Sequence, residues 1–170
     1  MSGLTRVALL FAGALCCFLS LPGIVRATAP EFFIVGEVYC EVCRINFINK
    51  LSEPMPGAKV KLECKGEEAG NITYTQEGET NESGQYRLKV EGDHADEECG
   101  ITLLKSSRAD CDEIPDEGWA SKPSSLITIT KNNGFHGSTR YANPLGFTKK
   151  KANPDCAELL KELEINPDHP

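Results

Sequence analysis

The sequence predicts a mainly β fold: a small antiparallel β-barrel or sandwich of about six to seven strands, with a short C-terminal helix and three disulfides. Three observations predict it. Short segments in which apolar and polar residues alternate recur between turn residues, as in half-buried strands. Helical spacing of apolar residues is found only near the end of the chain. Six cysteines follow an N-terminal segment with the pattern of a secretory signal, and such cysteines pair in the oxidising secretory route.

The first 29 residues differ in kind from the rest of the chain. Arg6 precedes an apolar stretch that is 19 residues long over positions 7–25, and residues 27–29 (Ala-Thr-Ala) form a small-x-small cleavage site. This order is typical of a secretory signal peptide. A membrane anchor is the alternative, because a spanning helix needs about 20 apolar residues. The break at Pro22 and Gly23 favours a signal peptide cleaved near residues 27–29.

The remaining residues, 30–170, have the length of a single domain. Without residues 1–29 the chain keeps 16 basic and 25 acidic residues, a net charge of −9. Binding to nucleic acid or to anionic membranes needs a basic face. We therefore expect a secreted, extracellular protein that has no nucleic-acid partner and, after signal cleavage, no membrane partner.

The expected strands follow in order from the residue pattern. Residues 31–39 are aromatic and β-branched and predict the first strand, with a bulge or a close backbone approach at Gly36. After turn residues at 54–57, residues 58–64 alternate between apolar and charged side chains, as a half-buried strand does. Further strands are expected over residues 71–76, 85–90, 99–104 and 125–131, the last of the strands.

Polar segments connect these strands, and a helix is expected after them. The expected connections are residues 65–70, 77–84, 92–98 and 106–122, the last being a long polar loop that contains Cys111. Near the end of the chain the apolar residues Cys156, Leu159, Leu160 and Leu163 lie on one face of a short helix. Asp155 is the expected N-cap of this helix, and Pro167 ends it.

Six cysteines remain after the signal: Cys40, Cys43, Cys64, Cys99, Cys111 and Cys156. They allow 15 pairings, and sequence spacing does not select one. A bond between Cys40 and Cys43 would close a very short loop and restrain little. We expect each of the two to reach a distant partner, because a bond across dozens of residues stabilises the fold by about 3–5 kcal/mol.

The Cys40-Glu41-Val42-Cys43 spacing has two further interpretations. One is a redox-active dithiol, which needs a helix directly after the pair. Residues 44–49 are poor helix formers, although the positive charge of Arg44 would favour a thiolate. A four-cysteine zinc site needs a second close pair, and the other cysteines are scattered singly. We therefore expect no metal, cofactor, catalytic residue or enzymatic activity, with a thiol oxidoreductase as the alternative.

The remaining polar patterns do not form a recognisable catalytic site. His94, His136 and His169 have no ligand or base at a typical spacing, and we expect all three to be solvated loop residues. The acidic segment 93–98 lacks the alternation of a calcium loop and is expected to be solvated. Two sequons, Asn71-Ile72-Thr73 and Asn81-Glu82-Ser83, predict N-glycosylation at Asn71 and Asn81.

The cysteine-bearing segments resemble a known family. Residues 35–44 are Val-Gly-Glu-Val-Tyr-Cys-Glu-Val-Cys-Arg, and residues 56–64 are Pro-Gly-Ala-Lys-Val-Lys-Leu-Glu-Cys. With residues 84–86 (Gly-Gln-Tyr), residues 143–147 (Asn-Pro-Leu-Gly-Phe) and Cys156, they make the chain similar to the olive-pollen major allergen family (Ole e I-like, extensin type), close to goosefoot-type pollen allergens. The resemblance covers essentially the whole chain after the signal.

The resemblance implies a disulfide pairing: Cys40 with Cys111, Cys43 with Cys156, and Cys64 with Cys99. These bonds would tie the first strand to the long loop and to the terminal helix. At Glu41 the chain departs from the family, which usually has Asp there. The family implies a β-barrel-like fold without established catalytic residues.

The resemblance also implies a function. Members are secreted proteins of the pollen wall or pollen tube, associated with pollen hydration, germination and tube growth, and many are allergens that bind IgE in sensitised hosts. We expect a non-enzymatic glycoprotein that binds an extracellular protein or a cell-wall polysaccharide. A protease inhibitor that presents the 106–122 loop is a further alternative, since small disulfide-bonded domains often display a rigid loop.

Overall fold

The structure, a computed structural model, describes residues 31–66, 70–92, 94, 96–114, 124–127 and 137–165. The expected signal peptide lies outside these residues, as do His136, His169, Pro167 and positions 115–123 of the long loop. Among the residues described, no helical segment has the length and apolar character that a membrane crossing requires.

The described residues form nine strands and one helix. These are β1 (Glu31–Glu41), β2 (Glu53–Pro54), β3 (Lys59–Gly66), β4 (Ile72–Glu79), β5 (Gln85–Glu91), β6 (Glu97–Lys105), β7 (Ser124–Ile127), β8 (Thr139–Tyr141), β9 (Leu145–Thr148) and α2 (Cys156–Glu162). The two short strands after β7 and the short β2 were not predicted. They contain only two to four residues each, too few for an alternating pattern to stand out.

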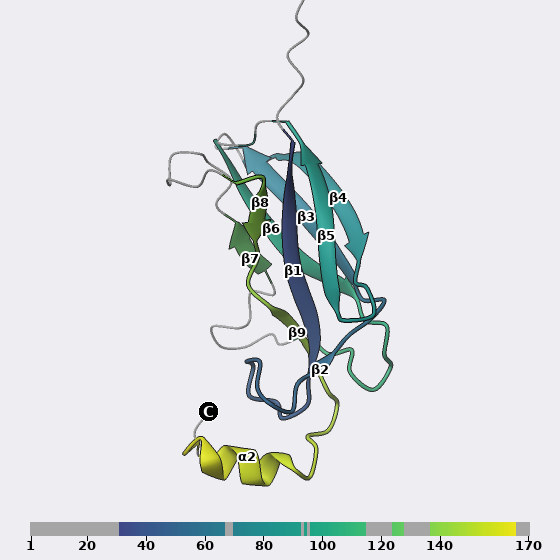
Figure 1. Ribbon diagram of the computed structural model, residues 1–170, viewed down its shortest axis with the longest axis vertical. Helices are drawn as coiled ribbons and strands as arrows, with labels where there is room; N and C mark the ends of the chain where they lie inside the picture. Colours follow the sequence, from purple (N-terminus) through teal and green to yellow (C-terminus); the bar gives the residue numbers. More distant parts are fainter. Residues whose placement is uncertain are drawn as a thin grey trace, which may run out of the picture.

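The strands form two sheets that pack as a sandwich (Figure 1). In the first sheet β1 lies at the centre and pairs with β2, β5, β8 and β9, whereas the second sheet has the order β4-β3-β6-β7. The sandwich prediction is confirmed, and the alternative of a closed barrel is wrong. The sheets are not wholly antiparallel, because β8 and β9 run parallel to β1.

The core lies between the two sheets. Alternate residues of β3 and β5 point inward: Val60, Leu62 and Cys64 from β3, and Tyr86, Leu88 and Val90 from β5, each at most 3% exposed. The intervening residues, which include Lys59 and Arg87, face solvent. The predicted period of two is therefore confirmed for these strands. Apolar burial of this kind contributes about 25 cal/mol per Å².

Gly36 makes room for an aromatic ring and does not form a bulge. The pairing of β1 with β5 runs through it without interruption, and Gly36 faces Tyr86 directly. A Cβ added at Gly36 would collide with the ring and hydroxyl of Tyr86. The close approach predicted at Gly36 is therefore present, but the group that approaches the glycine is the Tyr86 side chain and not another backbone segment.

Strand β4 is longer than predicted. Residues 77–79, expected in a loop, pair with β3, where Glu77 faces Lys61 and Gly78 faces Val60. β4 is an edge strand whose residues are half-buried or exposed, so polar side chains are tolerated along its length. The polar composition of residues 77–79 therefore predicted a loop, although these residues continue the strand.

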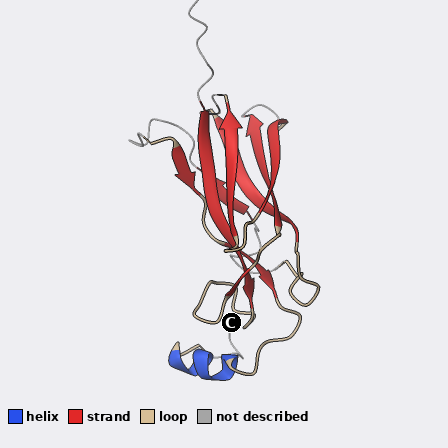
Figure 2. Cartoon of the chain, turned by 45° about the vertical axis from the view of Figure 1, so that its right-hand side comes forward, coloured by secondary structure: helices blue, strands red, loops and turns tan. Residues whose placement is uncertain are grey.

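The terminal helix α2 lies at one end of the sandwich, beyond β2 and β9 (Figure 2). Cys156 and Leu159 are buried, whereas Leu163 is 41% exposed and lies just after the helix. Asp155 occupies the predicted N-cap position but makes no side-chain cap hydrogen bond. The helix is attached instead by the Cys43–Cys156 disulfide, and an exposed ion pair joins Glu162 to Lys50.

Candidate functional site

Three disulfides connect the six cysteines. Cys40 bonds to Cys111, Cys43 to Cys156, and Cys64 to Cys99, with Cα–Cα distances of 6.0, 5.4 and 4.0 Å. This is the pairing that the family resemblance implies. The first two bonds join β1 and its following loop to the 106–114 segment and to α2, and the third links directly opposed residues of β3 and β6. All six cysteines are at most 5% exposed.

The loop after β1 is organised by a buried carboxylate. The Glu41 side chain is 1% exposed, and its two oxygens accept the backbone N–H groups of Cys43 at 2.8 Å and Ile45 at 2.9 Å. The side-chain amide of Asn49 lies 3.4 Å from the same carboxylate. This role of Glu41 was not predicted, because a glutamate between two cysteines gives no sign of burial in the sequence.

The Cys40–Cys43 segment lacks the surroundings of a redox-active pair. The two cysteines are not bonded to each other, and the residues after Cys43 form bends, not a helix. The side chain that contacts this segment is the Glu41 carboxylate, which accepts the backbone N–H of Cys43, whereas a reactive thiolate needs a positively charged neighbour. Arg44 does not face the sulfurs but donates to the Lys149 carbonyl at 2.7 Å and to the Glu113 carboxylate at 2.5 Å.

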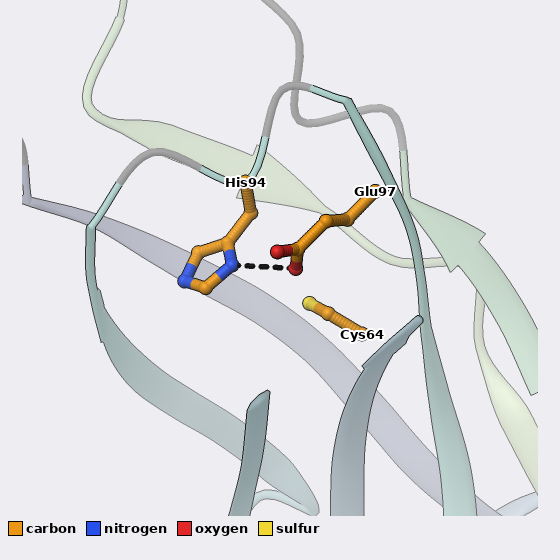
Figure 3. A group of neighbouring side chains, drawn as sticks. All are labelled: Cys64, His94 and Glu97. Carbon is orange, nitrogen blue, oxygen red and sulfur yellow. Dashed lines mark hydrogen bonds and ion pairs between the residues drawn. The ribbon is translucent and has the colours of Figure 1, made fainter. Parts of the chain in front are cut away.

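A second polar cluster lies where β5 leads into β6 (Figure 3). His94 is 8% exposed, so its expected solvation is wrong. Its Nδ1 lies 2.7 Å from the Glu97 carboxylate, and its Nε2 lies 3.2 Å from the Glu91 carbonyl oxygen. The Tyr74 ring packs on the imidazole with 4.7 Å between centroids. Each ring nitrogen lies within hydrogen-bonding distance of an oxygen atom, so burial of the imidazole leaves neither nitrogen without a polar neighbour.

Glu97 ionises readily in this cluster. Its carboxylate also accepts the Thr73 hydroxyl at 2.8 Å. Partial burial works against the charge, but the hydrogen bonds from His94 and Thr73 outweigh it and hold the pKa of Glu97 below its ordinary value. The acidic segment 93–98, expected to be solvated throughout, therefore includes one structural carboxylate.

The same cluster has the residue types of a metal site but not its chemistry. Ligand atoms of Cys64, His94 and Glu97 lie within 4.8 Å of one another (Figure 3). The Cys64 sulfur is bonded to Cys99 and therefore cannot supply a thiolate. Two side-chain ligands remain in this group, fewer than the three or four of a zinc site.

The first sheet has a groove of about 650 Å³ on its outer surface, along β1 and β5. Val35 pairs with Arg87 on one side and with Tyr141 on the other, so these three side chains form one row across the sheet. Glu37 and Gln85 form a neighbouring row. Figure 1 shows β8, β1 and β5 side by side in the layer that carries this row. The groove was not predicted from the sequence, because β8, which carries Tyr141, was itself not predicted.

Both predicted glycosylation sites are exposed. Asn71 precedes β4, and Asn81 lies in the turn between β4 and β5. The Asn81 side-chain oxygen accepts hydrogen bonds from the backbone N–H groups of Ser83 and Gln85, each at 3.0 Å. Glycosylation at either position stays a prediction.

Comparisons with known proteins agree with the resemblance. The profile of the family described as "Pollen protein Ole e 1 like" matches residues 30–164. The chain is 50% identical to an "Olee1-like protein" of Betula pendula over 89% of this chain and 90% of that one. It is 48% identical to "Major pollen allergen Lig v 1" of Ligustrum vulgare over 81% and 92% of the two chains. The crystal structure of the major plantain pollen allergen Pla l 1 superposes with a TM-score of 0.69 at 44% identity, covering 75% of this chain and all of the other.

Proposed function

The chain belongs to the pollen Ole e 1-like family, and from this membership we propose that it is a secreted, non-enzymatic pollen glycoprotein that binds an extracellular partner. The partner is a protein or a cell-wall polysaccharide, encountered during pollen hydration, germination or tube growth. Because relatives are named as pollen allergens, we also propose that it binds IgE in sensitised hosts.

The observation that carries this proposal is the state of the Cys40 and Cys43 pair. Each cysteine is buried and bonded to a partner 71 or 113 residues away. Bonds closing loops of this length stabilise a fold by about 4–5 kcal/mol each through the entropy of the unfolded chain. Buried sulfurs do not exchange readily with an external thiol, because attack needs access to the disulfide. The cysteines therefore support a rigid surface and not redox chemistry.

The surface that this scaffold presents suits binding. The groove beside β1 and β5 combines an exposed aromatic ring, a guanidinium and a carboxylate on a sheet whose opposite face is packed in the core. A binding site with a few fixed polar groups on a rigid scaffold loses little conformational entropy when the partner arrives.

The proposal is tested with protein expressed from residues 1–170 in a secretory host, so that the expected signal is processed and the disulfides form. We expect saturable binding to the surface of germinating pollen and no reduction of insulin disulfides, with thioredoxin as the positive control. A reduced and alkylated sample is the matched control and is expected not to bind. Equal binding by the alkylated sample, or turnover of insulin by the native protein, would contradict the proposal.

A further inference from the structure

We propose that the groove along β1 and β5, here called the outer groove, binds a neutral oligosaccharide segment of a hexose polymer. This inference rests on the proposed function and deepens it by assigning a surface and a chemical class of ligand. Four features of the groove carry it: an exposed aromatic ring, a cation held in place, a row of mixed hydrogen-bonding groups, and the sign of the surrounding charge.

The first feature is Tyr141. Its side chain is 76% exposed, the largest exposure among the exposed large hydrophobic residues of the described chain. The ring stands beside Val35 at the end of the row that crosses β8, β1 and β5. A large aromatic surface left in water is costly unless a partner covers it. The C–H face of a pyranose ring is flat and apolar, and it stacks on such a phenol ring.

The second feature is the position of Arg87. Its guanidinium lies 3.7 Å from the centre of the Phe33 ring, which belongs to the same outer face. Stacking on an aromatic ring restricts the guanidinium, and its edge N–H groups stay available as donors. Donors fixed before the ligand arrives lose little entropy on binding. Arg87 therefore offers donors with restricted freedom at the β5 side of the outer groove, across Val35 from Tyr141.

The third feature is the row next to Arg87. Glu37 and Gln85 are direct partners across β1 and β5, so their side chains lie side by side in the groove. A carboxylate accepts hydrogen bonds, an amide both donates and accepts, and a guanidinium only donates. A sugar hydroxyl is at once a donor and an acceptor, and successive hydroxyls of a hexose need both kinds of partner. The two rows supply them on one surface.

The fourth feature is charge, and it selects a neutral polymer. The groove is lined by two carboxylates, Glu37 and Glu79, and one guanidinium, Arg87. The nearby ammonium of Lys89 is already bound by Glu31 at 2.9 Å and Glu91 at 3.0 Å. The chain as a whole has a net charge of −7. A polymer of uronic acids would be repelled by this surface, whereas neutral hexoses would not.

The test is a titration of the secreted protein with neutral hexose hexasaccharides (β-1,4-glucan, β-1,3-glucan and β-1,4-mannan) and with a hexagalacturonate. We expect saturable binding of at least one neutral hexasaccharide and none of the hexagalacturonate. Tyr141→Ala is expected to weaken the binding at least tenfold, whereas Tyr141→Phe keeps the ring and stays within threefold of the wild type. Leu163→Ala, which removes an exposed apolar residue at the far end of the molecule, is the matched control and should not change the affinity.

A second variant tests the effect of charge with a substitution that keeps the size of the side chain. Glu37→Gln keeps a hydrogen-bonding group but removes one carboxylate, so we expect neutral binding within threefold and detectable binding of hexagalacturonate. Failure of every neutral hexasaccharide to bind, a preference of the wild type for hexagalacturonate, or an unchanged affinity in Tyr141→Ala would overturn the inference. If pollen-surface binding persists in Tyr141→Ala while no hexasaccharide binds, the proposed function stands and the outer groove is not its site.

Discussion

The buried carboxylate of Glu41 accepts the backbone N–H of Cys43 at 2.8 Å, so the cysteine that reaches α2 is positioned by a side chain two residues before it. The same carboxylate accepts the N–H of Ile45. Between these residues Arg44 has a positive φ of 60°, a conformation that non-glycine residues adopt only when their surroundings enforce it. Glu41 thus shapes the turn from which the Cys43–Cys156 bond leaves β1.

Removing the Glu41 carboxylate should destabilise the protein. Glu41→Ala leaves two N–H groups without their acceptor in a buried loop, and we expect a loss of about 2–4 kcal/mol in the free energy of unfolding. Glu41→Gln keeps one acceptor and should lose less than half of that. Urea denaturation of oxidised protein measures both. Glu77→Ala on the exposed edge strand is the control and should stay within about 0.5 kcal/mol of the wild type.

The Glu97 cluster predicts a dependence of stability on pH. Because the folded-state pKa of Glu97 lies below its unfolded value, the carboxylate stabilises the fold fully above the unfolded pKa of about 4.3 and loses this contribution as the pH falls through the folded pKa. We expect Glu97→Gln to flatten the loss of stability on acidification below about pH 5. Chemical unfolding at a series of pH values tests this, and parallel curves for the two proteins would contradict it.

Removing different disulfides should lower the free energy of unfolding by different amounts. The Cys43–Cys156 bond spans 113 residues and the Cys64–Cys99 bond spans 35. Loop-closure entropy gives a contribution of about 5 kcal/mol for the first and about 4 kcal/mol for the second. We expect Cys43→Ala/Cys156→Ala to lose about 1 kcal/mol more than Cys64→Ala/Cys99→Ala. Hydrogen exchange should also rise around α2 in the first variant only.

Gly36 and Tyr86 should be energetically coupled. Gly36→Ala places a methyl group against the Tyr86 ring in the core, and we expect a loss of about 1–3 kcal/mol. Shortening the opposing side chain relieves the collision, so Gly36→Ala/Tyr86→Leu should cost less than the sum of the single changes. A double-mutant cycle from denaturation curves measures the coupling, and strict additivity would show that no collision occurs.

Glycosylation at the two sequons is expected to add one N-glycan at each site. Intact-mass measurement of secreted protein should show Asn71→Gln and Asn81→Gln each lighter by a single glycan, and the double variant without any. We expect higher occupancy at Asn71, because its sequon ends in Thr. A mass unchanged by one of the substitutions would exclude that site.

Much of the fold was predictable because apolar and polar residues alternate along the strands in the same way as buried and exposed positions do. The alternation of Val60 and Leu62 with lysines located β3, and the same pattern located β5. The parallel strands β8 and β9 escaped prediction because their place is set by β1, more than a hundred residues earlier in the chain, and not by their own few residues. Tertiary pairing of this kind leaves no local signal.

The candidate site was less predictable for a related reason. Glu41 and His94 are polar residues whose burial depends on acceptors and donors that other segments supply. Polar and charged residues are usually exposed to solvent, so their residue type alone predicts that they lie on the surface. The exposure of Tyr141 was not predicted either, because a large aromatic side chain is usually buried, whereas this one is in contact with solvent. The cysteine pairing came from resemblance, because spacing alone left 15 possibilities.

The central position of β1 determines when the chain can complete its fold. Phe33 in this strand pairs with Thr139, and Tyr39 pairs with Gly146, so its partners are synthesised more than a hundred residues after it. Until then one edge of an apolar strand has no neighbour and is open to aggregation. Such late-closing topologies fold slowly. Folding should therefore depend on chaperones that protect β1 until β8 and β9 are available, and a product shortened before β8 should not reach the native state.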